Sequence, residues 1–496
     1  MKTKLRSLVF LLALGNAGMA ASSHALSRDR NEERVRPATG PLRVSSANPR
    51  YFSDGSGRPI YLTGFHDGSE LQDNAWGDDQ GKGFDYETFL DLFTTYNLNL
   101  SRMWVVETTR LTAKQTALAN PMPYKRTGPA RALDGEPKFN LSQFDQTYFD
   151  RLRSRVMAAQ DRGIYVMVML FQGFSIESKG SSKRDPWPGH PYHSVNNVNG
   201  INGDVNGNGE GEEVHTLKIP AITRLQEAYV RKVVDTLNDL DSVLYEISNE
   251  SHNQSTGWQY HMIRYIHDYE KRKPKQRPVV MTVTVPEGDN SALFKSPAAA
   301  ISPNRVGGYG NDPPAADGMK IIVNDTDHVA TKTANHGWVW KSFLRGLNPI
   351  LLWNPEKAEI PKWELTRRNL GYTRRYAQRI NLATMVPRDD LSSSKYCLAH
   401  PGVAYLVYLP SGGMASVDLH AAKGTMRVEW FSPSTGEVVD GGTTEGGATK
   451  EFTSPFTRSL VRRGIDRVLR ALVVERPVPH SDAVLYLTAD KVTSQP

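Results

Sequence analysis

The sequence predicts an α/β protein in which a (β/α)8 TIM barrel precedes a C-terminal antiparallel β-sandwich. From residue 60 to about 385, apolar strand-like runs alternate with amphipathic helical segments. About eight such repeats over roughly 330 residues favour a closed parallel barrel. After residue 388 the pattern changes to short alternating strands separated by Gly, Pro and Ser turns, which is typical of a sandwich.

The expected barrel strands are eight short stretches rich in apolar residues. They are residues 60–66, 98–104, 164–170, 243–249, 279–285, 300–304, 319–325 and 348–353. The gaps between them have helical periodicity; Tyr86, Phe89, Leu90 and Phe93, for example, share one face. A doubly wound open sheet is the alternative, but no glycine-rich turn follows the first strand, so the barrel is favoured.

The chain divides into a leader and two domains. Residues 1–25 have the layout of a secretory signal peptide, in which basic residues precede an apolar run and small residues follow it. The barrel is expected over 42–388 and the sandwich over 389–490, with a basic, helix-patterned insertion at 456–480. No other apolar run approaches the roughly 20 residues that span a bilayer. We therefore expect a secreted or periplasmic protein without a membrane span.

Composition excludes several classes of function. The net charge of +7 is spread along the chain without a long basic run, which favours a solvated surface over nucleic-acid binding. Cys397 is the only cysteine, so no intramolecular disulfide can form. The histidines lack HExxH or CxxC spacing, and we expect neither a catalytic metal nor a cofactor.

The stretch VLYEISNES, residues 243–251, places acids in an apolar strand. Alternate strand residues share a face, so Glu246 and Glu250 would point into the barrel. Glu250 stands at the carboxyl end, where barrel enzymes place their chemistry, and Asn249 beside it can hydrogen-bond a bound hydroxyl. An Asn-Glu pair in an ordinary turn is the structural alternative. We interpret Glu250 as a catalytic acid.

A second acid is expected at the end of the seventh strand, in IIVNDTDH. Asp325 follows the apolar run directly and is the first choice as nucleophile; Asp327 is the second. A structural Asp-rich turn is the alternative. Arg102, in the middle of the second strand, would pair with Glu246 and a strand-seven aspartate. Such a pairing would keep the nucleophile ionised while Glu250 stays protonated.

Other side chains at strand ends would contact a substrate. Aromatic faces suit apolar ring surfaces, and polar groups suit hydroxyls. The expected substrate-binding residues are His66, Trp104, Gln172 and Trp353, together with Asn249 and Arg102. Further candidates for substrate contact are Glu107 and the loop residues Trp76 and Trp187. Core or loop packing is the alternative for each residue taken alone.

The loop DVNGNGEGEE, residues 204–213, begins like a calcium loop. Oxygen-bearing side chains at Asp204, Asn206 and Asn208 precede Gly209. Residue twelve of the pattern is His215, where an EF-hand has a bidentate glutamate. An ordinary turn-rich loop is therefore favoured, with calcium as the alternative.

Several longer motifs resemble one group of bacterial proteins. NPRYFSDGSGRPIYLTGFH, NNVNGINGD, LYEISNES, DTDH and YCLAHPGVAYLVYLPSGG are similar to cellulase-like glycoside hydrolases that carry a "putative collagen-binding domain" at the C-terminus. The resemblance runs from about residue 42 to 488 and is broken by the 456–480 insertion. It departs at the seventh strand, where a glutamate is usual in that superfamily and this chain has aspartates.

The resemblance implies a secreted glycoside hydrolase acting on an oligo- or polysaccharide. It implies Glu250 as acid/base, a strand-seven acid as nucleophile, and retention of anomeric configuration. It also implies that the C-terminal domain contacts matrix or polysaccharide. One alternative is a non-catalytic carbohydrate- or collagen-binding protein with a degenerate barrel; another is a different barrel hydrolase that uses the same acids.

Overall fold

The computed structural model describes residues 37–76, 83–112, 114–177, 184–286, 288–329, 335–352, 361–456 and 481–489. The expected signal peptide, Trp353 and residues 457–480 of the expected insertion lie outside these ranges. In the part of the chain that is described, no helix has both the length and the apolar character to cross a bilayer.

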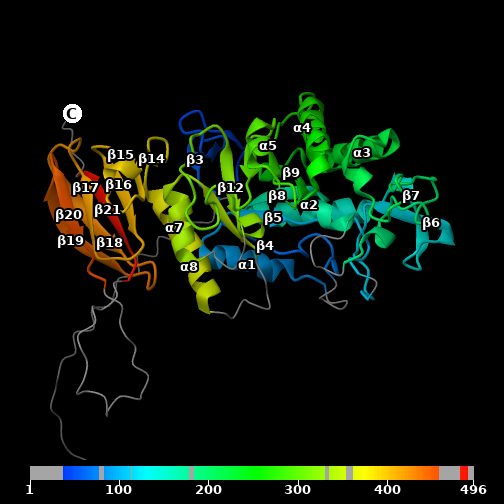
Figure 1. The fold of residues 1–496 in the computed structure, drawn as a ribbon, viewed down its shortest axis with the longest axis horizontal. Coiled ribbons are helices and arrows are strands. Elements are labelled where there is room, and N and C mark those ends of the chain that lie inside the picture. Colours follow the sequence, from blue (N-terminus) through cyan, green and yellow to red (C-terminus); the bar gives the residue numbers. More distant parts are fainter. Residues whose placement is uncertain are drawn as a thin grey trace, which may run out of the picture. The chain divides into compact units, whose positions relative to one another are not determined.

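Eight parallel strands close into a barrel (Figure 1). They are β4 (Gly64–His66), β5 (Leu100–Met103), β8 (Tyr165–Gln172), β9 (Val243–Asn249), β10 (Val279–Thr282), β11 (Ala300–Ser302), β12 (Ile321–Asp325) and β13 (Asn348–Leu352). Each lies within or overlaps one of the predicted stretches. Closure comes from β13, which pairs with β4 in the register Ile350↔Gly64. The predicted barrel is confirmed, and the open sheet is excluded.

Helices follow most of the strands. They are α1 (Tyr86–Tyr96), α2 (Gln146–Asp161), α3 (Pro220–Leu237), α4 (Thr256–Glu270), α5 (Asn290–Lys295), α6 (Thr326–Val329), α7 (His336–Leu344) and α8 (Pro361–Arg379). Helix α1 begins where the Asp85 carboxylate accepts from the Thr88 amide, and it ends at Asn97 in the left-handed conformation. Its apolar face is buried against the barrel as predicted.

Strand alternation separates two cores. On β9, Val243, Tyr245 and Ile247 belong to the core between strands and helices. Leu244 belongs to a second core inside the barrel. An N-terminal sheet contains β1 (Arg43–Val44), β2 (Phe52–Ser53) and β3 (Pro59–Ile60). Phe52 of this sheet and Leu42, just before β1, join the inner core. The amino end of the barrel is thus filled with apolar side chains, and the polar inward positions lie toward the carboxyl ends.

Two long connections at the carboxyl ends form a separate small core. One contains the hairpin β6 (Tyr124–Arg131) and β7 (Pro137–Phe144). The other contains the short helices η1 (Gly173–Ser175), η2 (Trp187–Gly189) and η3 (Glu212–His215), and η4 (Asn253–Ser255) follows β9. Tyr124, Phe139, Trp187, Tyr192 and Val214 pack together in this core.

The C-terminal strands form two antiparallel sheets. The larger has the order β14–β15–β16–β21–β18–β19, and β17 pairs with β20. The strands are β14 (Val386–Pro387), β15 (Cys397–His400), β16 (Ala404–Leu409), β17 (Met414–Asp418), β18 (Thr425–Phe431), β19 (Val438–Glu445), β20 (Thr449–Thr453) and β21 (Ala483–Ala489). Side chains of both sheets share one core that includes the buried Cys397. The predicted sandwich is confirmed.

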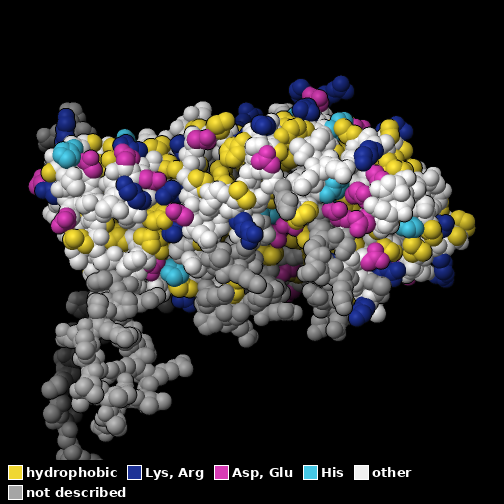
Figure 2. Space-filling view, viewed as in Figure 1, with side chains coloured by type: hydrophobic (Ala, Val, Ile, Leu, Met, Phe, Trp, Pro, Cys, Tyr) yellow, Lys and Arg dark blue, Asp and Glu magenta, His cyan; other side chains and the backbone are white. Residues whose placement is uncertain are grey.

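The sandwich also packs against the barrel helices. Trp340 of α7 and Tyr376 of α8 share an apolar cluster with Tyr408 and Phe431 from the larger sheet. On the face drawn in Figure 2, basic and acidic side chains are interspersed without a basic patch.

Candidate active site

Arg102 lies at the centre of the carboxyl end of the barrel, on β5, and is fully buried. Its Nε and Nη2 donate to the two oxygens of Glu246 at 2.7 and 2.6 Å. Its Nη1 donates to Asp325 Oδ2 at 3.1 Å and to Asp327 Oδ2 at 3.0 Å. Nη2 also donates to Asn249 Oδ1 at 2.7 Å. One guanidinium therefore orders four side chains from β9, β12 and α6.

The groups around Arg102 and Asp325 favour the ionised forms of both side chains. Burial by itself would lower the pKa of Arg102, but Glu246, Asp325 and Asp327 raise that pKa well above its ordinary value. For Asp325, burial would raise the pKa, yet His66 and Arg102 together hold it well below its ordinary value. The site therefore keeps Asp325 as a carboxylate.

Asp325 is enclosed on both of its oxygens. Oδ1 accepts from His66 at 3.0 Å and from the backbone amide of Asp327 at 2.9 Å, and Oδ2 accepts from Arg102. The Trp104 indole donates to His66 Nδ1 at 2.7 Å. An indole nitrogen is a donor only, so Nδ1 must accept and Nε2 must carry the proton given to Asp325. The Asp325 side chain is only 1% exposed, so it holds its hydrogen-bond partners in place rather than facing solvent.

Asp327 is the more accessible acid of the pair. It is the second residue of α6, two residues beyond the end of β12, and its side chain is 13% exposed. The helical turn carries it past the strand end while Arg102 still binds one of its oxygens. Asp327 thus has one oxygen held by Arg102 and a side chain that is partly exposed.

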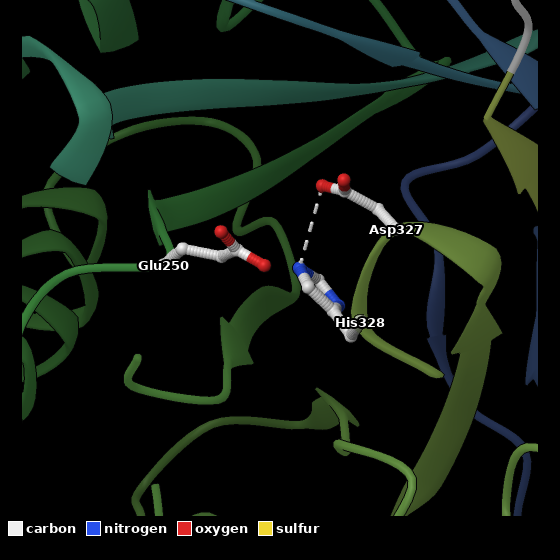
Figure 3. Close-up of side chains that lie close together, drawn as sticks. All are labelled: Glu250, Asp327 and His328. Carbon is white, nitrogen blue, oxygen red and sulfur yellow. Dashed lines mark ion pairs between the residues drawn. The ribbon is translucent and has the colours of Figure 1, made fainter. Parts of the chain in front are cut away.

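Glu250 lies directly after β9 and faces Asp327 (Figure 3). Carboxylate oxygens of Glu250 and Asp327 and a ring nitrogen of His328 lie within 4.8 Å of one another. The backbone of Glu250 is left-handed, with φ of 44°, an uncommon conformation for a glutamate. This turn takes the side chain out of the strand's alternation and sets it across from α6.

Asn249 links Arg102 to His328 beside the two acids. His328 Nε2 lies 3.0 Å from Asn249 Oδ1, which also accepts from Arg102. Because that amide oxygen only accepts, His328 donates from Nε2, and Nδ1 is left to accept from the Ser302 hydroxyl at 2.7 Å. Burial first, and then Arg102, lower the pKa of His328, which favours the neutral ring.

Glu250, Asp327 and His328 are ligand types that could hold a metal. Their hydrogen bonds argue otherwise. His328 Nε2 carries a proton toward Asn249, and Asp327 is already paired with Arg102. The arrangement suits two cooperating carboxylates better than a cation.

A second buried network supports the loop after β9. Glu107 accepts from His215 Nε2 at 2.9 Å and from the Gln172 amide at 2.8 Å. Burial would raise the pKa of Glu107, but His215 and His190 lower it to about 2. His215 stacks on Trp258 and reaches the Ser251 hydroxyl at 2.9 Å through Nδ1. This network fixes the residue that follows Glu250.

The residues predicted for the site come together at this end of the barrel. Arg102, Asn249, Glu250, Asp325, Asp327, His66, Trp104 and Gln172 all lie within the hydrogen-bonded cluster or beside it. His66, Trp104 and Gln172 are buried, at 4% exposure or less, and position other side chains. Trp187 is likewise buried, against Gly203 and Gly211, and Trp76 is half-buried. Trp353 lies outside the described residues.

His328, His215 and Ser251 were not assigned roles from the sequence. The motif DTDH contains His328, so its position beside the acids was a usable signal. Nothing local indicates His215 or Ser251, because Glu107 lies 108 residues from His215, and His215 lies 36 residues from Ser251.

Comparisons with known proteins agree with this architecture. A family model described as "Domain of unknown function (DUF6298)" matches residues 109–299, and one described as "Putative collagen-binding domain of a collagenase" matches 383–472. Two solved glycoside hydrolases from Bacteroides vulgatus ATCC 8482 are similar in fold. One, of family 5, has a TM-score of 0.57 at 12% identity over 90% of this chain and 93% of its own. The other, described as a putative glycoside hydrolase, has a TM-score of 0.58 at 11% identity over 90% and 82%.

The chain has the fold of a glycoside hydrolase. A further structure titled "Glycoside hydrolase" has a TM-score of 0.54 at 11% identity over 91% of this chain and 97% of its own. The shared fold and the match of residues 383–472 confirm the fold and the C-terminal domain that the resemblance implied. A search of curated protein sequences finds no match.

Proposed function

We propose that the protein hydrolyses O-glycosidic bonds of an oligo- or polysaccharide by a retaining mechanism, with Glu250 as acid/base and Asp327 as nucleophile. The observation that carries this proposal is the facing pair itself, whose carboxylate oxygens lie within 4.8 Å. Retaining enzymes hold their carboxyl groups about 5–5.5 Å apart, and inverting enzymes about 6.5–9.5 Å. The short spacing supports retention.

The contacts of the two acids suit these roles. Arg102 donates to Asp327 Oδ2 and holds in place the side chain that would attack the anomeric carbon. Glu250, 9% exposed and across the pocket, would protonate the departing oxygen. In the second step Glu250 accepts a proton from water, the water attacks the anomeric carbon, and Asp327 departs as a carboxylate.

Asp327 replaces Asp325 as the preferred nucleophile. The sequence favours Asp325 because it follows the strand directly, yet both of its oxygens accept hydrogen bonds and its side chain is almost inaccessible. The aspartate is one methylene shorter than the glutamate usual in this superfamily. Asp327 lies in α6, beyond the end of the strand, and this position compensates for its shorter side chain.

Export and surface contact belong to the same proposal. The layout of residues 1–25 supports a secreted or periplasmic location. The match of residues 383–472 supports contact of the C-terminal domain with matrix or polysaccharide. The alternative, a binding protein with an inactive barrel, gives no role to the facing acids Glu250 and Asp327.

Hydrolysis of a panel of aryl glycosides and polysaccharides tests the proposal. Glu250→Gln should lower kcat/KM by at least about 100-fold, because a positioned general acid contributes about 10² to 10⁴. The exposed Glu136→Gln serves as the matched control and should retain full activity. Undiminished hydrolysis by Glu250→Gln would remove the acid/base assignment. Binding of sugars without hydrolysis by the wild type would favour the binding-protein alternative.

Gly173 should also be needed for activity, since it lies against the backbone of Glu250. A Cβ at this position would lie 2.3 Å from the Glu250 carbonyl oxygen and 2.6 Å from its carbon. Gly173→Ala should therefore destabilise the fold by about 1–3 kcal/mol and displace Glu250. A displacement of this size should reduce kcat at least about tenfold.

Gly257→Ala is the control for Gly173→Ala. Gly257 lies in α4, and a Cβ there meets nothing within 4 Å. It should leave kcat unchanged and add up to about 1 kcal/mol of stability by raising helix propensity. Equal kinetics in the two variants would show that Gly173 has no part in placing Glu250.

A further inference from the structure

The backbone conformation of Glu250 needs support from other parts of the chain. A residue other than glycine with φ of 44° is strained, and such a conformation persists only where the surrounding structure holds it. Two short helices contact the peptide that joins Glu250 to Ser251. A Cβ on Gly173 of η1 would lie 2.7 Å from the Ser251 amide nitrogen. His215 of η3 reaches the Ser251 hydroxyl at 2.9 Å. Whatever holds these two helices therefore also affects the position of the acid.

Glu107, on the loop after β5, contacts both of these short helices. Its Oε1 accepts from the backbone amide of Gln172, the N-cap of η1, at 2.8 Å. The same oxygen accepts from His215 Nε2, in η3, at 2.9 Å. The Glu107 backbone amide donates to the hydroxyl of Ser175, the last residue of η1, at 2.9 Å. One residue thereby ties η1 and η3 to each other.

The hydrogen bonds between Ser251 and Glu107 run in one direction. A carboxylate oxygen only accepts, so His215 Nε2 carries the proton that it donates to Glu107. Nδ1 of the neutral ring then accepts from the Ser251 hydroxyl, whose oxygen can in turn accept from Ser248. Ser248, Ser251 and His215 are fully buried. Buried hydrogen bonds in a chain strengthen one another, so a change at the Glu107 end should weaken the contact at Ser251.

We propose that Glu107, His215 and Ser251 are positioning residues for the proton donor Glu250. They hold the peptide after Glu250 in the conformation that turns its carboxyl toward Asp327 (Figure 3). The sequence makes Glu107 a candidate for substrate contact, but its Oε1 is directed to η1 and η3. This inference rests on the proposed function, because it concerns the step in which Glu250 protonates the departing oxygen.

The dependence of hydrolysis on the leaving group tests this role. The probes are the phenyl and dinitrophenyl glycosides of a sugar that the wild type hydrolyses. For a retaining enzyme kcat/KM reports the formation of the glycosyl-enzyme, in which phenolate needs a proton and dinitrophenolate does not. Glu107→Gln and Ser251→Ala should each lower kcat/KM at least about tenfold for the phenyl glycoside and less than about twofold for the other. The first change preserves shape and the second removes one oxygen, so either variant can carry the test if the other fails to fold.

A surface pair and a double variant provide the controls. Glu227 accepts from His261 at 2.8 Å in a more exposed pair, so Glu227→Gln should leave both rates unchanged. In a Glu250→Gln background, Glu107→Gln should lower kcat/KM for the phenyl glycoside less than about twofold, because the donor that it positions is gone. An equal loss with both leaving groups, or the full further loss in the double variant, would overturn the positioning role.

Hydrogen exchange followed by mass spectrometry tests the relay without a substrate. Peptides that span residues 248–252 should exchange at least about tenfold faster in Glu107→Gln and Ser251→Ala than in the wild type, because local opening becomes easier. Glu227→Gln should exchange like the wild type. Unchanged exchange in both relay variants would overturn the inference. Faster exchange in the variants of a chain that hydrolyses no glycoside would contradict the proposed function and leave the relay in place.

Discussion

Replacing Asp327 with glycine is expected to reduce hydrolysis of an activated aryl glycoside at least about 1000-fold, because the covalent step loses its nucleophile. Azide should restore turnover by occupying the space of the lost carboxylate. The product should be a glycosyl azide of inverted configuration, since one displacement has replaced two. Proton NMR of the anomeric centre measures this directly.

Asp325→Gly is the comparison that separates the two aspartates. Its side chain binds His66 and Arg102 beneath the pocket, so azide placed there cannot reach a substrate. Activity should fall without rescue. With Glu250→Gly, azide should instead intercept the glycosyl intermediate and give the retained product. Rescue of Asp325→Gly with an inverted product would restore Asp325 as the nucleophile, and inverted sugar from the wild type would exclude the covalent mechanism.

Arg102→Met should destabilise the protein by about 3–5 kcal/mol, because it leaves buried acids without their cation. Glu246 and Asp325 are fully buried, and both bind this guanidinium. Urea unfolding at neutral pH measures the loss. The control is Arg153→Met, whose surface pair with Asp239 should contribute about 1 kcal/mol or less.

The loss of unfolding free energy in Arg102→Met should become smaller as the pH falls. In the wild type the lowered pKa of Asp325 adds stability above its ordinary pKa of 3.8, and this is lost as the pH falls through the folded pKa. Without Arg102, His66 still lowers that pKa but one of the two opposing groups is gone, so the pKa rises and protonation would relieve the variant at a higher pH than in the wild type. The gap between variant and wild type should therefore narrow from pH 7 to pH 4.5. A constant gap would mean that packing, rather than charge, accounts for the loss.

The pairing of Arg102 could be predicted because strand periodicity is local. Two-residue alternation on β9 places Glu246 inside the barrel, and an arginine on a neighbouring inward position requires such a partner. The bonds to Glu246 and Asp325 follow that reasoning. The choice between Asp325 and Asp327 could not be made in this way. It depends on His66, 259 residues away, which occupies one oxygen of Asp325.

The sequence by itself determined the barrel, the sandwich, and the acids that meet at the carboxyl end, since apolar periodicity and turn residues act over short distances along the chain. Only the tertiary structure decided which acid faces Glu250. Exposure and hydrogen bonding of a side chain are set by residues from other strands, and a left-handed turn such as that at Glu250 redirects a side chain in a way that no local pattern records.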